Sequence, residues 1–523
     1  MPIVQQGSIN TTALVVPDLY VQIVPPQNLV LNGVPTNIVG IVGTASWGPV
    51  GQPSIIATMT DYASIFGPLI ARKYDMGTQI ATAVQQGASN FRCVRVTDGT
   101  DTSATLTLPG TSFTLVALYT GSLGNRIAIS LGTGSQAGSW RLTLSLPGLQ
   151  PEVFDNIMGT GASFWTNLAA AINTGTGLQR GPSQLVVANA GGTSTSVTAL
   201  STTFAIGTPG SDGAGTASAA TLIGSDVVPR QGMYALRGQG CSIGLLADAD
   251  DSSQWTTQAA FGLQEGLYMI LTGPAADNIA NAVAVKQAVG LDTYACKLMF
   301  GDWIWWNDQV NATLRLVSPQ GFVAGRLANL SPEQSSLNKP LYSVVGTQKS
   351  GAPGTTQQAS YASADLGVLL AAGIDVIANP QPAGSFWGVR GGHNSSSNAA
   401  TNGDNYTRLT NYIAATLASG MGQYVGQVIN QSLFRRIRAT QLSFLQAMLS
   451  QGLLGSTDGS LPFSVICDAS NNPATRTGLG YVQSDAQVQY QAINEKFIVN
   501  IEGGQTVQVQ SQVLPGTPGS LNA

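Results

Sequence analysis

The sequence predicts a multidomain protein of mixed α/β and α+β class. We expect a discontinuous α/β middle domain with a β-rich insertion, and an α+β C-terminal domain that terminal strands complete. Three observations predict this architecture. Strand and helix patterns alternate over residues 28–99 and again over 226–395, whereas residues 100–225 show the period-two alternation of β structure. Two helical runs follow residue 396, and both ends of the chain show strand-like alternation.

The first α/β segment alternates buried strands with helices. Residues 38–43 form an apolar run typical of a buried strand, and residues 91–96 predict another. Between them, residues 60–67 predict a short helix with Thr60 as its N-cap, and residues 75–86 predict a longer helix. This rhythm is that of a βαβ arrangement.

The α/β pattern resumes after residue 226. Strands are expected over 242–247, 268–272 and 294–300, and helices over about 252–265 and 277–290. Because the same rhythm returns, residues 28–99 and 226–395 are expected to form one domain into which residues 100–225 are inserted as an outer domain. The insertion is expected to be all-β apart from a helix around 164–172, and residues 189–226, almost pure Gly, Ser, Thr and Ala, predict a mobile loop or weak strands.

The composition points to self-assembly. Charged residues make up only 9% of the 523 residues, against about a quarter in an ordinary soluble domain. A monomer with so few charges is poorly protected against association, so its surface is expected to be covered by copies of itself. The 22 Lys and Arg against 26 Asp and Glu leave no basic field for nucleic acid, and the apolar runs are too short for membrane insertion.

Residues that carry catalysis or bind metals are scarce. The single histidine, His393, lies in a Gly- and Ser-rich run where an exposed loop residue is expected rather than a catalytic base. The four cysteines, at positions 93, 241, 296 and 467, lack the spacing of metal ligands and are expected to be buried thiols, with a disulfide across subunits as the alternative. We therefore expect no enzyme activity, no cofactor and no metal site.

A tryptophan cluster offers a different functional class. Trp303, Trp305 and Trp306 could stack on a sugar, which would make the protein a carbohydrate-binding surface or virion decoration module, but core packing at the end of a strand is the stronger interpretation. Three acidic residues earlier in the chain, Asp248, Asp250 and Asp251, suit a helix N-cap better than a calcium loop.

Both ends of the chain carry uncharged strand-like sequence. The alternating apolar residues are Leu19, Val21 and Ile23 at one end, and Val507, Val509 and Val513 at the other. An uncharged terminal strand either completes its own sheet or adds to the sheet of a neighbour. Because the N-terminal arm over residues 1–27 and the C-terminal strand share this pattern, exchange of strands between subunits is a serious alternative to pairing within one chain.

Residues 429–451 predict a strongly amphipathic helix. At about 100° per residue, its large apolar side chains fall on one arc. Arg436 projects from the opposite side, Arg435 lies at the margin of the arc, and Arg438 lies within it, where internal pairing or snorkelling is expected. Arg435 and Arg436 are therefore candidates for binding a partner, and a solvated polar face is the equally weighted alternative.

Several short motifs follow one another along the chain in a fixed order. They are Val16-Pro17-Asp18-Leu19-Tyr20-Val21, Trp47-Gly48-Pro49 after the first strand, Gly321-Phe322-Val323-Ala324-Gly325, Phe386-Trp387-Gly388-Val389-Arg390 and Gly452-Leu453-Leu454-Gly455. In this order the chain resembles the contractile tail sheath proteins of bacteriophages, over nearly its whole length except residues 100–225. One departure is the segment 422–426, which replaces the family's aromatic-acidic-proline-asparagine turn.

The resemblance implies a structural role in a virion tail. Sheath subunits polymerise as stacked hexameric rings around a tail tube, and contraction drives the tube through the host envelope. The implied partners are other copies of the chain, the tail tube protein, and the baseplate and neck or tail terminator proteins. The terminal arms would complete a sheet in a neighbour's C-terminal domain, which would face the tube, and the subunits would assemble in the host cytoplasm.

Overall fold

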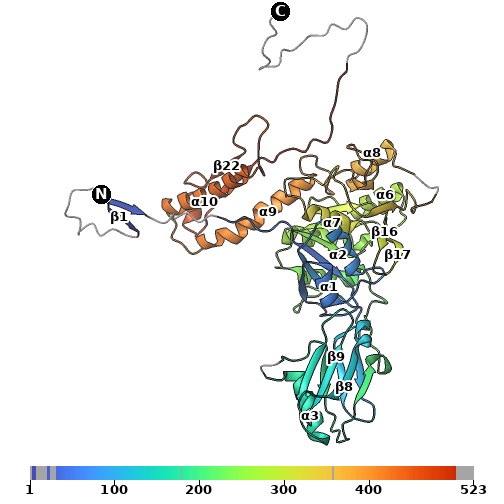
Figure 1. Cartoon of the computed structure of the whole chain (residues 1–523). Coiled ribbons are helices and arrows are strands. Elements are labelled where there is room, and N and C mark those ends of the chain that lie inside the picture. The colour runs from blue at the N-terminus through green and yellow to red at the C-terminus, as the bar shows by residue number, and fades with distance from the viewer. Residues whose placement is uncertain (1–2, 7–19, 24–30, 178–179, 356–358, 502–523) are drawn as a thin grey trace, which may run out of the picture. The chain divides into compact units, whose positions relative to one another are not determined.

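The computed structural model describes residues 3–6, 20–23, 31–177, 180–355 and 359–501 (Figure 1). It has a mixed α/β fold with several sheets, as the sequence predicts. Contacts divide the chain into two units, Met1–Gln491 and Ala492–Ala523, and the first contains every helix and strand of the described chain.

The largest sheet has seven strands in the order β19-β15-β14-β13-β3-β5-β4. The strands are β3 (Val39–Gly43), β4 (Pro53–Ile56), β5 (Phe91–Arg95), β13 (Ile243–Leu246), β14 (Tyr268–Thr272), β15 (Cys296–Met299) and β19 (Ile374–Asp375). Neighbouring strands are parallel, except that β4 runs antiparallel to β5. Strands from both predicted α/β segments thus pair in one sheet, because β3 lies directly beside β13.

Helices cover both faces of this sheet, which explains why its central strands β3, β13 and β14 are buried at every position. The first face is covered by α1 (Met59–Phe66), α2 (Met76–Gln85) and α7 (Gln320–Ala328). The second is covered by α4 (Ala219–Ile223), α5 (Trp255–Glu265), α6 (Ile279–Val289) and α8 (Ser363–Ala371). Within β3, Ile41 joins the first core and Val42 joins the second, so neither position tolerates a polar side chain.

Two glycines let α7 approach α2 closely. A Cβ atom on Gly325 would lie 2.5 Å from the Cα of Ala83, and one on Gly321 would lie 2.1 Å from the Oγ1 of Thr82. No larger residue fits at either position. The small-residue motif at 321–325 is therefore explained by helix packing.

Two local expectations are wrong. The first helix is capped by Thr58 and not Thr60, since the Thr58 hydroxyl accepts a hydrogen bond from the Asp61 backbone and the Asp61 carboxylate accepts one from Thr58. The segment around His393 is not an exposed loop. Gly391, Gly392 and His393 donate backbone hydrogen bonds to the buried Asp375 carboxylate, and His393 itself is half-buried.

Residues between β5 and β13 form further sheets with their own hydrophobic core. One sheet has the order β11-β7-β6 and the other β10-β9-β8-β12. Their strands are β6 (Ser103–Thr107), β7 (Thr114–Thr120), β8 (Ala128–Thr133), β9 (Trp140–Ser145), β10 (Glu152–Ile157), β11 (Val186–Asn189) and β12 (Leu200–Thr203), and the expected helix is α3 (Gly161–Thr174). Apart from Trp47, their buried apolar residues all lie between Ala104 and Phe204. The stretch expected to be a loop or weak strands contains β12 and also α4, which packs on the central sheet.

The last part of the first unit consists of two long helices and a small sheet. The elements are α9 (Asp404–Met421), α10 (Gln431–Ser450), β22 (Phe463–Ile466), α11 (Ala474–Thr477) and β23 (Asp485–Val488). Near the N-terminus, β1 (Ile3–Gln6) pairs in parallel with β2 (Tyr20–Ile23).

Candidate assembly surface

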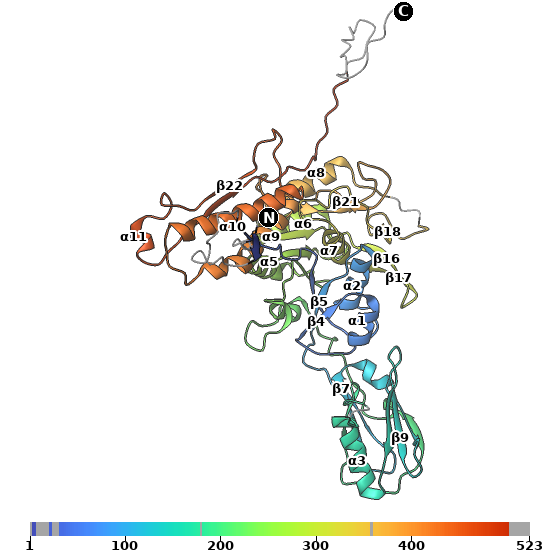
Figure 2. The ribbon, with the colours of Figure 1, turned by 60° about the vertical axis from the view of Figure 1, so that its left-hand side comes forward.

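Helix α10 is built as the sequence predicts and carries the core of the C-terminal part. The Asn430 side chain caps it by accepting a hydrogen bond from the Leu433 backbone. Its apolar arc is buried against α9 and β22, through Phe444, Leu445 and Met448 in particular. Figure 2 shows β22 running alongside α10.

The three arginines of α10 are all exposed. Arg435 donates to the Gln431 side chain at 3.3 Å, and Arg436 donates to the Gln427 side chain at 3.0 Å and lies over the Tyr424 ring. Arg438 is exposed rather than buried within the arc, and its charge helps to lower the pKa of Asp468, after the hydrogen bonds from Ser470. Among the described residues, no carboxylate forms an ion pair with any of these three guanidinium groups.

The connection between α9 and α10 exposes a pair of aliphatic side chains that the sequence did not single out. Val425 and Val428 are almost fully exposed, next to Arg436. The hydroxyl groups of Tyr424 and Thr440 lie 2.6 Å apart and tie this loop to α10. The loop includes residues 422–426, where the sequence departs from the family motif. That departure was the only feature of the sequence that pointed to this loop.

The sheet formed by β22 and β23 has only two strands in the described chain. The strands are antiparallel, with Phe463 opposite Val488 and Ile466 opposite Asp485. Phe463 and Val465 are buried against α10, whereas Ile466 is exposed. Such a narrow sheet leaves backbone N–H and C=O groups on both outer edges without a described strand partner.

The predicted exchange residues fall mostly outside the described chain. Val21 and Ile23 lie in β2, opposite Val4 and Gln6 of β1. Leu19, Val507, Val509 and Val513 lie outside the described residues. The described residues of the second unit, 492–501, have no helix or strand and expose large apolar side chains, among them Phe497 (82% exposed) and Ile501 (87% exposed).

The tryptophan cluster is part of the core. Trp303 and Trp306 are buried, and their indole N–H groups donate to the Gly273 carbonyl and to the Gln85 side chain. Trp305 is half-buried, so two of the three indoles are core residues, in line with the core-packing interpretation.

The four cysteines are buried and have no disulfide among the described residues. Asp251 caps a short turn before α5, as expected, whereas Asp248 accepts hydrogen bonds from the Tyr74 backbone and the Gln79 side chain instead of capping a helix.

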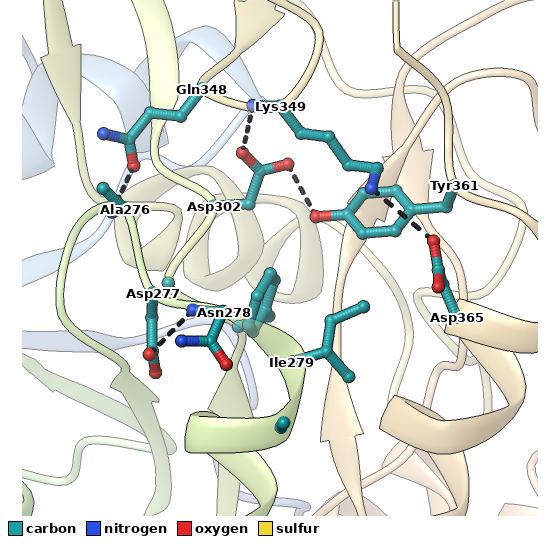
Figure 3. Close-up of a pocket in the computed structure, with 12 residues that line it drawn as sticks. Ala276, Asp277, Asn278, Ile279, Asp302, Gln348, Lys349, Tyr361 and Asp365 are labelled. Atoms are coloured by element: carbon teal, nitrogen blue, oxygen red, sulfur yellow. Dashed lines mark hydrogen bonds and ion pairs between the residues drawn. The ribbon is translucent and has the colours of Figure 1, made fainter.

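A pocket of about 520 Å³ lies at the carboxyl ends of β14 and β15 (Figure 3). Its polar groups bind one another. The Asp302 carboxylate accepts hydrogen bonds from the Lys349 backbone and the Tyr361 hydroxyl, both at 2.8 Å, and the Lys349 ammonium group lies 3.5 Å from Asp365. Burial raises the pKa of Asp302, although these two hydrogen bonds oppose the rise. No cluster of three or more metal-ligating side chains occurs among the described residues.

No helix in the described portion has the length and apolar composition of a membrane span.

Neither a family model nor a curated protein matches the sequence. Among solved structures, the chain is similar to the sheath tail protein of Desulfitobacterium hafniense, with a TM-score of 0.57, 16% identity, and coverage of 85% of this chain and 92% of that chain. The sheath tail protein of Listeria innocua gives a TM-score of 0.58 and 15% identity, covering 83% of this chain and 89% of that one. The contracted sheath of an extracellular contractile injection system, PVC, gives a TM-score of 0.55 and 12% identity over 95% and 99% of the two chains. The chain therefore has the fold of the tail sheath proteins and of contractile injection system sheaths.

Proposed function

We propose that this protein is the structural subunit of a contractile tail sheath, non-enzymatic and without a cofactor. Copies would polymerise as stacked hexameric rings around a tail tube and contract to drive the tube through the host envelope. The observation that carries the proposal is the fold likeness to sheath proteins over 83–95% of the chain. The low charge content agrees with it, because a surface with 9% charged residues is suited to being covered.

The domain layout expected from the sequence belongs to the same proposal. Residues 28–99 with 226–395 would form the middle domain, residues 100–225 an outer domain, and residues 396–523 the tube-facing domain. The separate hydrophobic cores of these regions support this division. Baseplate and neck or tail terminator proteins would bind the ends of the sheath, which would assemble in the host cytoplasm and end up in the virion tail or in a related injection particle.

We further propose that the terminal strands join the subunits. The N-terminal strand with Leu19, Val21 and Ile23, and the C-terminal strand with Val507, Val509 and Val513, would each add to the β22–β23 sheet of a neighbour. Two described features support this. The β22–β23 sheet has two edges without a described strand partner, and the exposed apolar side chains of residues 497–501 lead directly into the C-terminal strand. Backbone pairing would cover both.

Two kinds of variant test this proposal. One deletes the C-terminal strand, and the other places negative charges on one of its two faces. Deletion of residues 503–523 should leave a folded, soluble chain that does not form long tubes by negative-stain microscopy. Val507→Asp with Val509→Asp should have the same effect, because a carboxylate on the buried face of an added strand is desolvated. The matched control, Gln508→Asp with Gln510→Asp, adds the same charge to the other face and should still form tubes. Tubes of normal length from the deletion would overturn the strand exchange.

The tail tube contact is proposed to involve Arg435 and Arg436. Both side chains are exposed, and neither has an ion-pair partner in the described chain, so their charge is available to an acidic surface. Reversing both charges to Glu should weaken co-assembly with tube protein about tenfold in low salt, and less in high salt where charges are screened.

The matched control reverses two exposed arginines of the insertion, Arg126 and Arg141, which changes the net charge by the same amount. Co-sedimentation with tube protein across a salt series measures the effect. Equal losses in the two double variants would show that only net charge matters, and would remove the assignment to α10.

A further inference from the structure

The loop between α9 and α10 projects two valines into solvent. The two helices lie side by side (Figure 1), and residues 422–430 connect them. Val425 is 84% exposed and Val428 is 80% exposed, more than any other valine of the described chain. Exposed apolar area gains free energy when a partner removes it from water. The pair is therefore a candidate contact with another molecule.

The loop is held in one conformation. The Tyr424 and Thr440 hydroxyl groups lie 2.6 Å apart, and the Gln427 side chain accepts a hydrogen bond of 3.0 Å from Arg436. Between the two valines, Gly426 has a φ of 85°, which a residue with a side chain adopts only with strain. Because these contacts already fix the free loop, docking through it would lose little conformational entropy.

The surface beside the loop carries positive charge that this part of the chain does not balance. Residues 405–457 contain four arginines and no Lys, Asp or Glu, so they carry a charge of +4 in a chain whose net charge is −4. One of the four is buried, whereas Arg435, Arg436 and Arg438 are exposed on the first half of α10. Asp468, from outside this segment, interacts with the charge of Arg438. Arg435 and Arg436, with the positive end of the α10 dipole, therefore keep an unbalanced charge beside the loop.

These properties together fit an acidic protein surface as the partner. Positive charge beside apolar side chains also occurs at membrane-binding surfaces, but those surfaces use tryptophan, phenylalanine or leucine as anchors. In residues 404–451, Val425 and Val428 are the only large apolar side chains that are more than half exposed. Valine is short and has few rotamers, so it suits a shaped recess better than a fluid bilayer. The phosphate groups of nucleic acid would bind the arginines but give the valines no partner.

We propose that the loop of residues 422–430 is an apolar anchor for an acidic protein partner. Val425 and Val428 would enter a recess in the partner, beside the acidic groups that bind the arginines of α10. The inference rests on the tail tube contact proposed above and extends it, so the partner is the tube protein. Attraction between the charges would orient the partner during approach, and burial of the valines would slow its release.

Removing the apolar groups without changing the charge tests the anchor. Val425→Ser with Val428→Ser should weaken co-sedimentation with tube protein about tenfold. The loss should be the same in low and high salt, because apolar contacts are not screened as charges are. The loss from reversing the arginine charges, by contrast, should shrink as salt is added. The matched control is Val227→Ser with Val228→Ser, two valines of similar exposure in the connection after α4, which should bind like wild type.

Three results of this experiment would overturn the anchor. The first is unchanged binding of tube protein by the Val425 and Val428 variant, with circular dichroism checking that every variant folds. The second is an equal loss in the two valine variants, which would show that any exposed apolar pair has the same effect. The third is a loss that disappears in high salt, which would assign the whole contact to the arginines.

The same variants separate the anchor from other occupants and from the sheath function. If the Val425 and Val428 variant keeps tube binding but loses binding to phosphatidylcholine–phosphatidylserine vesicles, or loses self-association in sedimentation velocity, the valines belong to a membrane or to a second copy, and the anchor is overturned. Wild-type chains that form sheath tubes but do not sediment with tube protein would overturn the anchor and leave the sheath function standing. Binding of tube protein through the valines by chains that form no sheath tubes would support the anchor and refute sheath polymerisation.

Discussion

Asp75 is a buried carboxylate at the N-terminus of α2. It is fully buried and caps α2, where its Oδ2 atom accepts hydrogen bonds from the Thr78 backbone and hydroxyl group at 2.8 and 2.7 Å. Its Oδ1 atom has no hydrogen-bond partner among the described residues. Burial raises the pKa of Asp75 to about 6, although the Thr78 hydrogen bonds and Arg72 oppose the rise.

This raised pKa predicts a pH-dependent stability. Because the folded chain holds the proton more tightly than the unfolded chain, stability from Asp75 is greatest below pH 3.8 and is lost as the pH rises to about 6. The shift corresponds to about 3 kcal/mol of unfolding free energy. Asp75→Asn cannot titrate, so the difference in unfolding free energy between wild type and variant should change by about this amount between acid and neutral pH.

Urea unfolding at a series of pH values measures this difference. Asp61→Asn is the matched control, because Asp61 is also part of a helix cap, with Thr58, but is only half-buried, and the hydrogen bonds from Thr58 lower its pKa. The difference in unfolding free energy between Asp61→Asn and wild type should change with pH in the opposite direction. The contribution of Asp61 to stability is present at neutral pH and is lost as the pH falls. A pH-independent difference for Asp75→Asn would contradict the raised pKa.

At the scale of elements, the sequence was most informative where a single pattern decides the structure. The buried strand β3 and the amphipathic helix α10 are predicted almost to their ends. Burial on both faces of a strand gives a continuous apolar run, and burial on one arc of a helix gives a helical period of apolar residues. The helix α2 is also predicted to within a residue at each end, although its cap, Asp75, was not predicted. These elements include a central strand of the main sheet and the helix that carries the C-terminal core.

Elements decided by distant contacts were not predictable. The Gly- and Ser-rich segment at 391–395 reads as a flexible loop, yet it is held by Asp375, more than fifteen positions earlier in the chain. Arg438 falls within the apolar arc by angle, yet its side chain is exposed, whereas its neighbour Ile437 is buried. The candidate pocket was missed because its lining comes from five separate segments with no common motif.

At the scale of the whole molecule, one buried ionic cluster connects the central sheet to the C-terminal helices. Lys297 of β15 lies 2.6 Å from Asp375 of β19 and 3.1 Å from Asp404, the first residue of α9. The Tyr268 hydroxyl donates to Asp404 at 2.6 Å, and Ser336 donates to it as well. Burial alone would lower the pKa of Lys297 and raise that of Asp404. The charges of Asp375 and Asp404 instead raise the pKa of Lys297, and the charge of Lys297 with the hydrogen bonds from Ser336 and Tyr268 lowers that of Asp404.

Removing the central charge of this cluster should destabilise the whole chain. Lys297→Met leaves Asp375 and Asp404 buried without their cation, which is expected to cost about 3–5 kcal/mol of unfolding free energy. The matched control is Lys73→Met, which breaks a half-exposed pair with Asp250 and should cost about 1 kcal/mol or less. Urea unfolding at neutral pH compares the two.

Because Asp404 begins α9, the Lys297 variant should also expose the α9–sheet junction to hydrogen exchange before global unfolding, whereas the control should not. Equal losses of stability, or unchanged exchange at the start of α9, would show that the cluster does not fix the C-terminal helices to the sheet.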